Sequence, residues 1–225
     1  AWAVDIRETA LLGWMAFLVL TIAGERRELM QIVRLSFASR WLDSAGVGCI
    51  LVAVVASGVA TLSGTLTASL PRMLWWLACA GLASWLLRWD LASRSWRRPG
   101  WVGHTATCLT VGYVWLLAAG LLGLAGPWQA ERVTPVALHW VLLGFVFAMV
   151  FGHAPIILPA LVRVRPVYSA WLRTPVWLLA ASLVLRLAAA ESGSTSGLKW
   201  AGAGHALAVA LFAVLMLRAT MRAPR

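Results

Sequence analysis

Four histidines are the residues of this sequence best suited to chemistry, and each lies within a long apolar stretch: His104, His139, His153 and His205. Ionisable side chains inside membrane segments are costly, so they deserve a functional hypothesis. An imidazole nitrogen can ligate haem iron, bind a soft metal ion, or simply hydrogen-bond a neighbouring helix. The residue types alone leave these three roles open, and the elements that hold the histidines must decide between them.

Those elements are predicted to be membrane-spanning helices. Of the 225 residues, 61% are hydrophobic and 12% are charged, which is more apolar surface than a soluble domain of this size can bury. Seven runs have about the length needed to cross a bilayer: about 8–24, 45–65, 73–91, 102–126, 135–158, 174–190 and 199–217. We therefore expect an all-α, polytopic bundle of about seven transmembrane helices, forming one domain over residues 1–225.

The loop charges predict how this bundle is oriented. Loops with several arginines alternate with loops that carry a single cationic residue, and the alternation is unbroken along the chain. The positive-inside rule then places the N-terminus outside and the C-terminus in the cytoplasm of a bacterial inner membrane. The net charge of +11 sits mainly in these loops. It therefore indicates contact with the lipid bilayer, not nucleic-acid binding.

An amphipathic surface helix is predicted over residues about 26–42. Its apolar residues fall near one helical face: Leu29, Ile32, Val33, Phe37 and Trp41. Such a stripe beside arginines is typical of a helix lying on the membrane surface. An ordinary solvated loop is the alternative.

Helical rise sorts the four histidines by depth. His104 and His153 lie ~9 Å from the predicted inner boundary, and we call them the inner pair. His139 and His205 lie ~10 Å below the outer boundary and form the outer pair. His139 and His153 share one predicted helix and are 14 positions apart, a rotation only ~40° short of four full turns at 100° per residue. These two imidazoles are thus expected on nearly one face.

Two level-matched pairs are the arrangement required by two bis-histidine b-type haems stacked across a membrane. A macrocycle between helices also needs close backbone approach, for which five glycines are candidates: Gly112, Gly144, Gly152, Gly202 and Gly204. Arg186, within the sixth span, is the candidate cation for propionates of the outer haem. The inner haem would be flanked by Arg94, Arg97, Arg163 and Arg165. We therefore expect one or two haem b groups.

A copper site is a second possibility at the same histidines. Cys108 follows His104 by four residues, and Met149 precedes His153 by four, so each sulfur shares a helical face with an imidazole. Soft sulfur ligands suit Cu(I). The alternative is that these sulfurs only pack against other helices. No CxxCH motif occurs, so covalent attachment of c-type haem is excluded.

Two prolines close to His153 affect the backbone of its helix. Pro155 and Pro159 each lack an N–H, so each leaves a carbonyl one turn earlier without its usual donor. We expect the helix to kink near its end.

Three stretches together resemble bacterial membrane proteins akin to the NnrS family: Ala23–Leu29, His139–Gly144 and Phe151–Pro159. The resemblance covers mainly the first and fifth predicted helices. It implies a haem- or copper-binding role for His139 and His153, in a setting of nitric oxide and denitrification stress. The spacing His139-x13-His153 is also similar to the pattern on a haem-binding helix of the cytochrome b group.

The leading hypothesis is a membrane haem-b protein that passes electrons across the bilayer. Without a soluble catalytic domain, it would be an electron-transfer or accessory subunit of a larger complex, with other membrane or periplasmic redox subunits as partners. One alternative is an NnrS-like protein that handles nitric oxide or copper. Another is a non-redox scaffold subunit whose histidines only pack. A transporter is disfavoured because no acidic residue lies at the predicted mid-membrane level.

Overall fold

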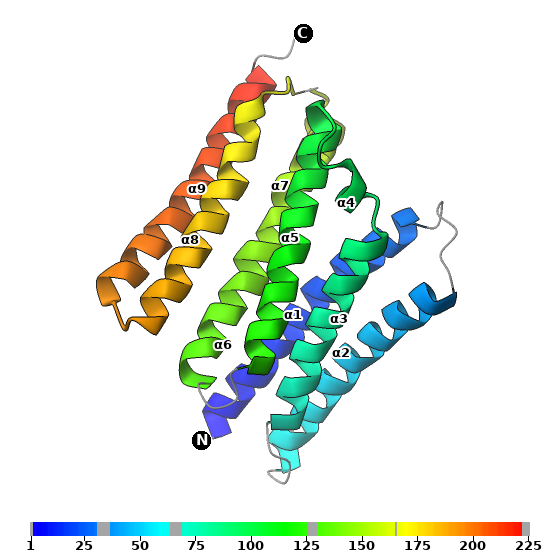
Figure 1. Ribbon diagram of the computed structural model, residues 1–225, viewed down its shortest axis with the longest axis vertical. Coiled ribbons are helices and arrows are strands. Elements are labelled where there is room, and N and C mark those ends of the chain that lie inside the picture. The colour runs from blue at the N-terminus through cyan, green and yellow to red at the C-terminus, as the bar shows by residue number, and fades with distance from the viewer. Residues whose placement is uncertain (1, 31–36, 64–68, 126–129, 165, 222–225) are drawn as a thin grey trace. The chain divides into compact units, whose positions relative to one another are not determined.

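The computed structural model describes residues 2–30, 37–63, 69–125, 130–164 and 166–221. Within these ranges the regular structure is helical throughout, and no strand occurs. Seven of the described helical stretches are long and apolar enough to cross a membrane (Figure 1). The prediction of an all-α bundle with seven spans is therefore confirmed.

The residues of the chain group by their contacts into two compact units. One unit comprises Ala1–Asp90 with Leu116–Val141, and the other comprises Leu91–Trp115 with Leu142–Arg225. Each unit is described by itself below.

The first unit is built on three consecutive helices, α1 (Trp2–Leu29), α2 (Phe37–Ser63) and α3 (Ser69–Trp89). Helix α2 packs against both α1 and α3 (Figure 1). Helix α5 (Gly100–Ala125) adds its last turns, where Gly120 allows very close approach. A Cβ atom at Gly120 would lie 2.6 Å from the backbone nitrogen of Ala80, so only glycine fits this crossing.

The surface helix predicted over residues 26–42 falls partly outside the described residues. Residues 26–29 form the end of α1, residues 37–42 form the start of α2, and residues 31–36 lie outside the described part of the chain. With 28 and 27 residues, these two helices are each ~40 Å long. They therefore extend past a hydrocarbon core of ~30 Å, and their ends hold three residues of the predicted apolar stripe, Leu29, Phe37 and Trp41.

The second unit contains α4 (Ala92–Ser95), the first turns of α5, and α7 (Ala148–Val162). A short 3-10 turn, η4 (Ala170–Arg173), leads into α8 (Thr174–Glu191). Helices α8 and α9 (Thr195–Met221) form an antiparallel hairpin (Figure 1). The tight connection between them uses Gly193 at φ 66°, a left-handed conformation that favours glycine.

The span predicted over residues 135–158 is one continuous helical run with an unusual middle. It consists of α6 (Ala130–His139), a π-helix η3 (Trp140–Phe147), and α7. Hydrogen bonds in a π-helix run from residue i to i+5, so a turn holds more residues than in an α-helix. The shared face of His139 and His153 was calculated with 100° at every step, and that premise does not hold across η3.

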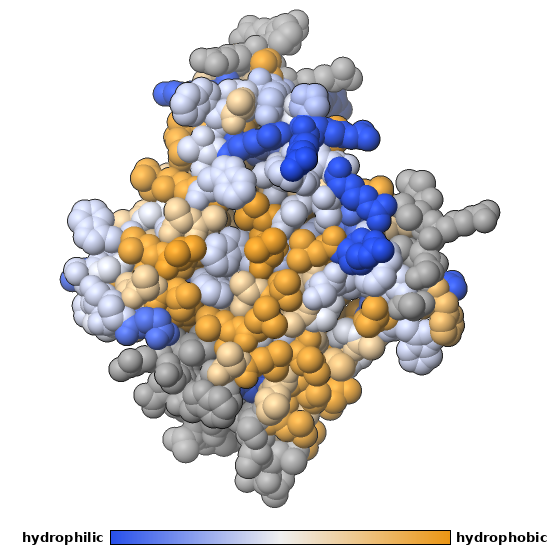
Figure 2. Space-filling model, viewed as in Figure 1, coloured by the Kyte–Doolittle hydropathy of each residue, from blue (hydrophilic) through white to orange (hydrophobic). Residues whose placement is uncertain are grey.

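Apolar side chains cover much of the visible surface (Figure 2). Several large ones are mostly exposed, including Trp14, Leu62, Leu161 and Trp200. In water such patches would be a liability, whereas in a bilayer they face lipid tails. This surface, together with the seven apolar helices, fits a multi-pass membrane protein in contact with lipid.

Candidate functional site

The centre of the candidate site is a backbone carbonyl that a proline leaves without its normal donor. In an α-helix the carbonyl of residue i accepts from the N–H of residue i+4. For Phe151 that residue is Pro155, which has no N–H. The Nε2 atom of His104 lies 3.0 Å from the Phe151 carbonyl oxygen. Because a carbonyl can only accept, Nε2 carries the hydrogen, and α5 supplies the donor that α7 lacks.

The His104 side chain is completely buried. The ring of Trp101 packs edge-on against it, with 5.7 Å between the ring centroids. Trp101 is itself held in place, because its Nε1 donates to the carbonyl of Pro166 at 3.2 Å. The other imidazole nitrogen, Nδ1, is buried and has no hydrogen-bond partner among the described residues. With Nε2 protonated, Nδ1 is the nitrogen whose lone pair is free to accept.

Cys108 lies beside the same imidazole. Its sulfur is 3.8 Å from Nε2 of His104, and both residues are fully buried. The sequence placed these two side chains on one face of a helix, and the structure brings them into contact. In the ranges that the structure describes, no group of three or more histidine, cysteine or acidic residues is arranged to hold a metal ion.

The glycines expected to admit a haem instead allow helices to touch. Four of the five face a neighbouring helix directly: Gly112, Gly144, Gly152 and Gly204. A Cβ atom at Gly112 would lie 2.5 Å from Cε of Met149, and one at Gly152 would lie 2.7 Å from Cδ1 of Leu109. These contacts close α5 onto α7, so the packing leaves no room for a macrocycle there. As packed, the inner site does not fit a haem.

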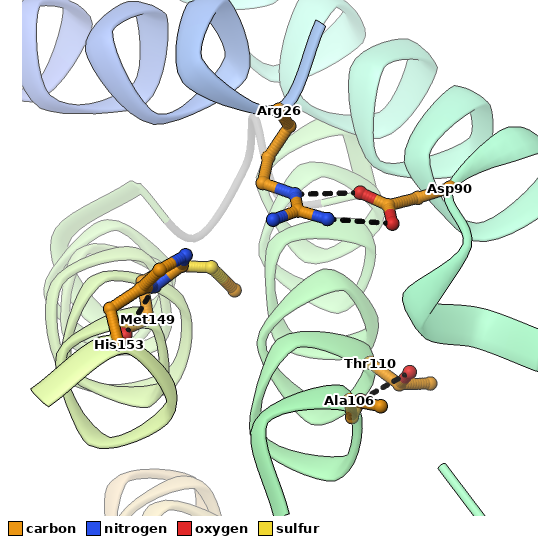
Figure 3. Close-up of polar contacts among 6 residues, drawn as sticks. All are labelled: Arg26, Asp90, Ala106, Thr110, Met149 and His153. Atoms are coloured by element: carbon orange, nitrogen blue, oxygen red, sulfur yellow. Dashed lines mark hydrogen bonds and ion pairs between the residues drawn. The ribbon is translucent and has the colours of Figure 1, made fainter. Parts of the chain in front are cut away.

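The imidazoles of the inner pair, His104 and His153, do not point toward a common site. Gly152 faces α5, and its carbonyl accepts a hydrogen bond from Oγ1 of Thr105 at 2.9 Å. Residues 151 and 153 on either side of it therefore turn to opposite sides of the α5–α7 contact. His104 reaches the Phe151 side. His153 is half-buried, and its Nδ1 donates to the carbonyl of Met149, one turn earlier in α7, at 2.8 Å (Figure 3).

The two histidines of the outer pair belong to different units. His139, in the first unit, donates from Nδ1 to the carbonyl of Pro135 at 2.7 Å. His205, in the second unit, is buried with Nδ1 2.6 Å from Oγ of Ser182. That hydroxyl already donates to the Leu179 carbonyl at 2.8 Å, so His205 must be the donor. This hydrogen bond joins α9 to α8.

The arginines proposed for haem propionates differ in exposure. The Nε atom of Arg186 is buried within α8 and has no hydrogen-bond partner in the described part of the chain. Arg94, Arg97 and Arg163 are exposed. Arg165 lies outside the described residues.

A buried ion pair in the first unit was missed by sequence reasoning. Arg26, near the end of α1, donates from Nε and Nη2 to the two carboxylate oxygens of Asp90 at 2.8 and 2.9 Å (Figure 3). Asp90 is fully buried, immediately after α3. Arg27, which follows Arg26 in the sequence, forms a second ion pair with the buried Asp43, at 3.2 Å between Nε and Oδ2. The available signal was that Asp43 and Asp90 are acidic residues at otherwise arginine-rich ends of spans.

We predict that Asp90→Ala lowers the free energy of unfolding by about 3–5 kcal/mol, because Arg26 would remain buried without its counter-charge. The double variant Arg26→Met/Asp90→Leu should recover most of that loss. Asp43→Ala is the control. Its partner Arg27 is half-exposed and can turn to solvent, so the loss should be at most ~1 kcal/mol. Thermal unfolding in detergent measures all three, and equal stability of Asp90→Ala and the wild type would contradict the prediction.

A double-mutant cycle tests the bond between His104 and the Phe151 carbonyl. His104→Leu leaves this carbonyl unpaired and should cost about 1–3 kcal/mol. Adding Pro155→Ala restores an N–H to α7 and should return much of the loss. Pro159→Ala is the matched control, because its new N–H serves a carbonyl one turn later. Equal rescue by both alanine variants in thermal unfolding would argue against the assignment.

Comparison with known proteins identifies the family of this chain. The model of the domain of unknown function DUF8744 matches residues 1–221. The chain therefore belongs to the DUF8744 family. No curated protein and no solved structure matches it.

Proposed function

We propose that this DUF8744 member is a multi-pass scaffold subunit of a larger complex in a bacterial cytoplasmic membrane. One observation carries the proposal: the imidazole of His104 replaces the backbone donor that Pro155 removes from α7. Membrane helices tolerate proline where a neighbouring helix pairs with the freed carbonyl. This histidine therefore has a sufficient structural reason to lie where it does, without a cofactor.

The other three histidines support the same role. Each also has a hydrogen bond to protein: His139 to Pro135, His153 to Met149 and His205 to Ser182. The first two of these bonds each lie within one helix and orient the ring, while the bond from His205 to Ser182 joins α9 to α8. Hydrogen bonds between membrane helices contribute about 0.6 kcal/mol on average. In the first unit the pair of Arg26 and Asp90 joins α1 to the end of α3 in the same manner. Buried polar groups that position helices are what a scaffold requires.

The orientation proposed for the scaffold follows from loop charge. The arginine-rich connections would face the cytoplasm, with the N-terminus outside and the C-terminus inside. Partner subunits would meet the chain within the bilayer or at its surfaces. Redox subunits are the partners expected under the haem hypothesis, and the scaffold proposal does not need them.

Haem content distinguishes the scaffold from an electron carrier. We expect the full chain, purified from haem-replete cells, to show no stoichiometric haem b in a pyridine haemochrome spectrum. His104→Gln should keep wild-type stability and the same co-purifying proteins, because the glutamine amide can still donate to Phe151. One or two haems per chain, lost on His104→Gln, would refute the scaffold proposal and favour transmembrane electron transfer.

Copper binding is a second candidate, favoured by the contact between Cys108 and His104. A cysteine sulfur and an imidazole 3.8 Å apart in a fully buried setting are suitable ligands for Cu(I). The resemblance to the NnrS family also implies copper, although for His139 and His153. A metal on Nε2 would displace the hydrogen bond to Phe151, so copper binding and this helix contact would compete.

A cysteine comparison tests the copper candidate. Under this candidate, the full chain loaded with Cu(I) should retain one copper after desalting, and Cys108→Ser should lose it. Cys79→Ser is the matched control, because Cys79 is equally buried but lies in the first unit. Metal analysis that finds copper in neither the wild type nor the control, or the same amount in both variants, would reject a site at Cys108.

A further inference from the structure

A cavity of about 530 Å³ lies in the second unit, between the segment that leads into α8 and the last turns of α9. Its walls are Tyr168, Leu172 and Thr174 on one side, and Leu211, Leu215 and Arg218 on the other. The two sides are fixed to each other, because the N–H of Val167 donates to the carbonyl of Ala219 at 2.9 Å. Cavities of this size hold small ligands.

The polarity of the cavity changes along α9. Arg218 lies in the last turn of α9, while Leu215 and Leu211 lie up to ~10 Å deeper in the apolar span. Thr174, the first residue of α8, also lines the cavity and has a hydroxyl. A cation and hydroxyls at one end with leucines at the other match a molecule that has a polar head and an apolar tail.

The positive charge of Arg218 at the polar end of the cavity favours an anionic ligand. Among the described residues that line the cavity, Arg218 has the only charged side chain, and none is acidic. Arg218 is exposed, so its guanidinium can reach a ligand that arrives from the membrane surface. The hydroxyls of Tyr168 and Ser169 are further donors in the wall. Phosphate oxygens are favoured partners of arginine and hydroxyl donors.

The depth of the cavity identifies the source of the phosphate. Arg218 sits three residues before the end of α9, where a span meets the headgroup layer. Trp171 beside it is largely exposed, as expected for an aromatic residue at this level. Basic pockets between membrane helices on the cytoplasmic side are known to hold anionic lipid headgroups.

We propose that this cavity binds the phosphate headgroup of an anionic phospholipid. Arg218 pairs with the phosphate, the hydroxyls of Tyr168 and Thr174 donate to its oxygens, and Leu215 and Leu211 contact the first part of an acyl chain. The site is separate from the histidines and does not depend on the scaffold role. Its cytoplasmic location rests on the orientation proposed above.

Native mass spectrometry of the full chain in a non-ionic detergent tests the proposal. Phosphatidylglycerol and phosphatidylcholine are added separately, and the lipid-bound fraction gives an apparent affinity. We expect phosphatidylglycerol to bind more tightly, and Arg218→Gln to weaken it about tenfold. Leu215→Trp, which fills the apolar end, should remove the bound lipid. Two variants serve as controls. Arg88→Gln changes an exposed arginine in the last turn of α3, and Leu161→Trp changes an exposed leucine of α7.

Three results would overturn the proposal. Equal binding of the two lipids would mean that charge is not recognised. Displacement by an equal concentration of inorganic phosphate would assign the site to free phosphate instead of lipid. Equal effects of Arg218→Gln and Arg88→Gln, together with unchanged binding in Leu215→Trp, would place any bound lipid outside this cavity.

Discussion

One hydrogen bond, from His104 in α5 to the carbonyl of Phe151 in α7, explains how α7 can hold Pro155 inside a bilayer. In a bilayer there is no water to pair with a carbonyl that loses its helical donor, so Pro155 creates a requirement that a neighbouring helix must meet. His104 meets it only because α5 and α7 approach closely at Gly112 and Gly152. A proline, two glycines and a histidine thus form one coupled feature.

Paired polar groups also join helices elsewhere in the chain. In the second unit His205 and Ser182 join α9 to α8, and in the first unit Arg26 and Asp90 join α1 to the end of α3. Each is a polar group at a helix contact, paired by a group from another element. Because an unpaired polar group is so costly in lipid, these contacts determine which helices can be neighbours. A fixed arrangement of helices is what the proposed scaffold role requires.

The helices could be predicted from the sequence because the length and polarity of a span are set by the bilayer. The predicted runs differ from the observed helices by a few residues at most ends. The exceptions are α1, which extends beyond its run at both ends, and α2, which begins at Phe37 instead of about residue 45. The freed carbonyl near Pro155 was also predictable, since proline lacks an N–H wherever it occurs. Its partner was not, because helix neighbours do not appear in hydropathy. Depth placed His104 beside His153, while the structure turns the Phe151 carbonyl toward His104 and leaves His153 hydrogen-bonded within α7.

Two further features could not be located from the sequence. The π-helix at Trp140–Phe147 changes the rotation per residue in a stretch whose residues are simply apolar. The ion pair of Arg26 and Asp90 joins positions 64 residues apart, which no local pattern connects. Glycines illustrate the same limit, because their spacing indicated close approach but not whether a cofactor or another helix would approach.

The most direct test of the central claim is the ¹⁵N NMR spectrum of the His104 ring in the full chain, assigned by comparison with His104→Gln. The hydrogen bond to Phe151 requires a proton on Nε2, so the spectrum should show a protonated Nε2 and an unprotonated Nδ1. A proton on Nδ1 with Nε2 bare would show that His104 does not donate to the carbonyl of Phe151, and signals shifted and broadened by bound iron would show that a metal takes its place.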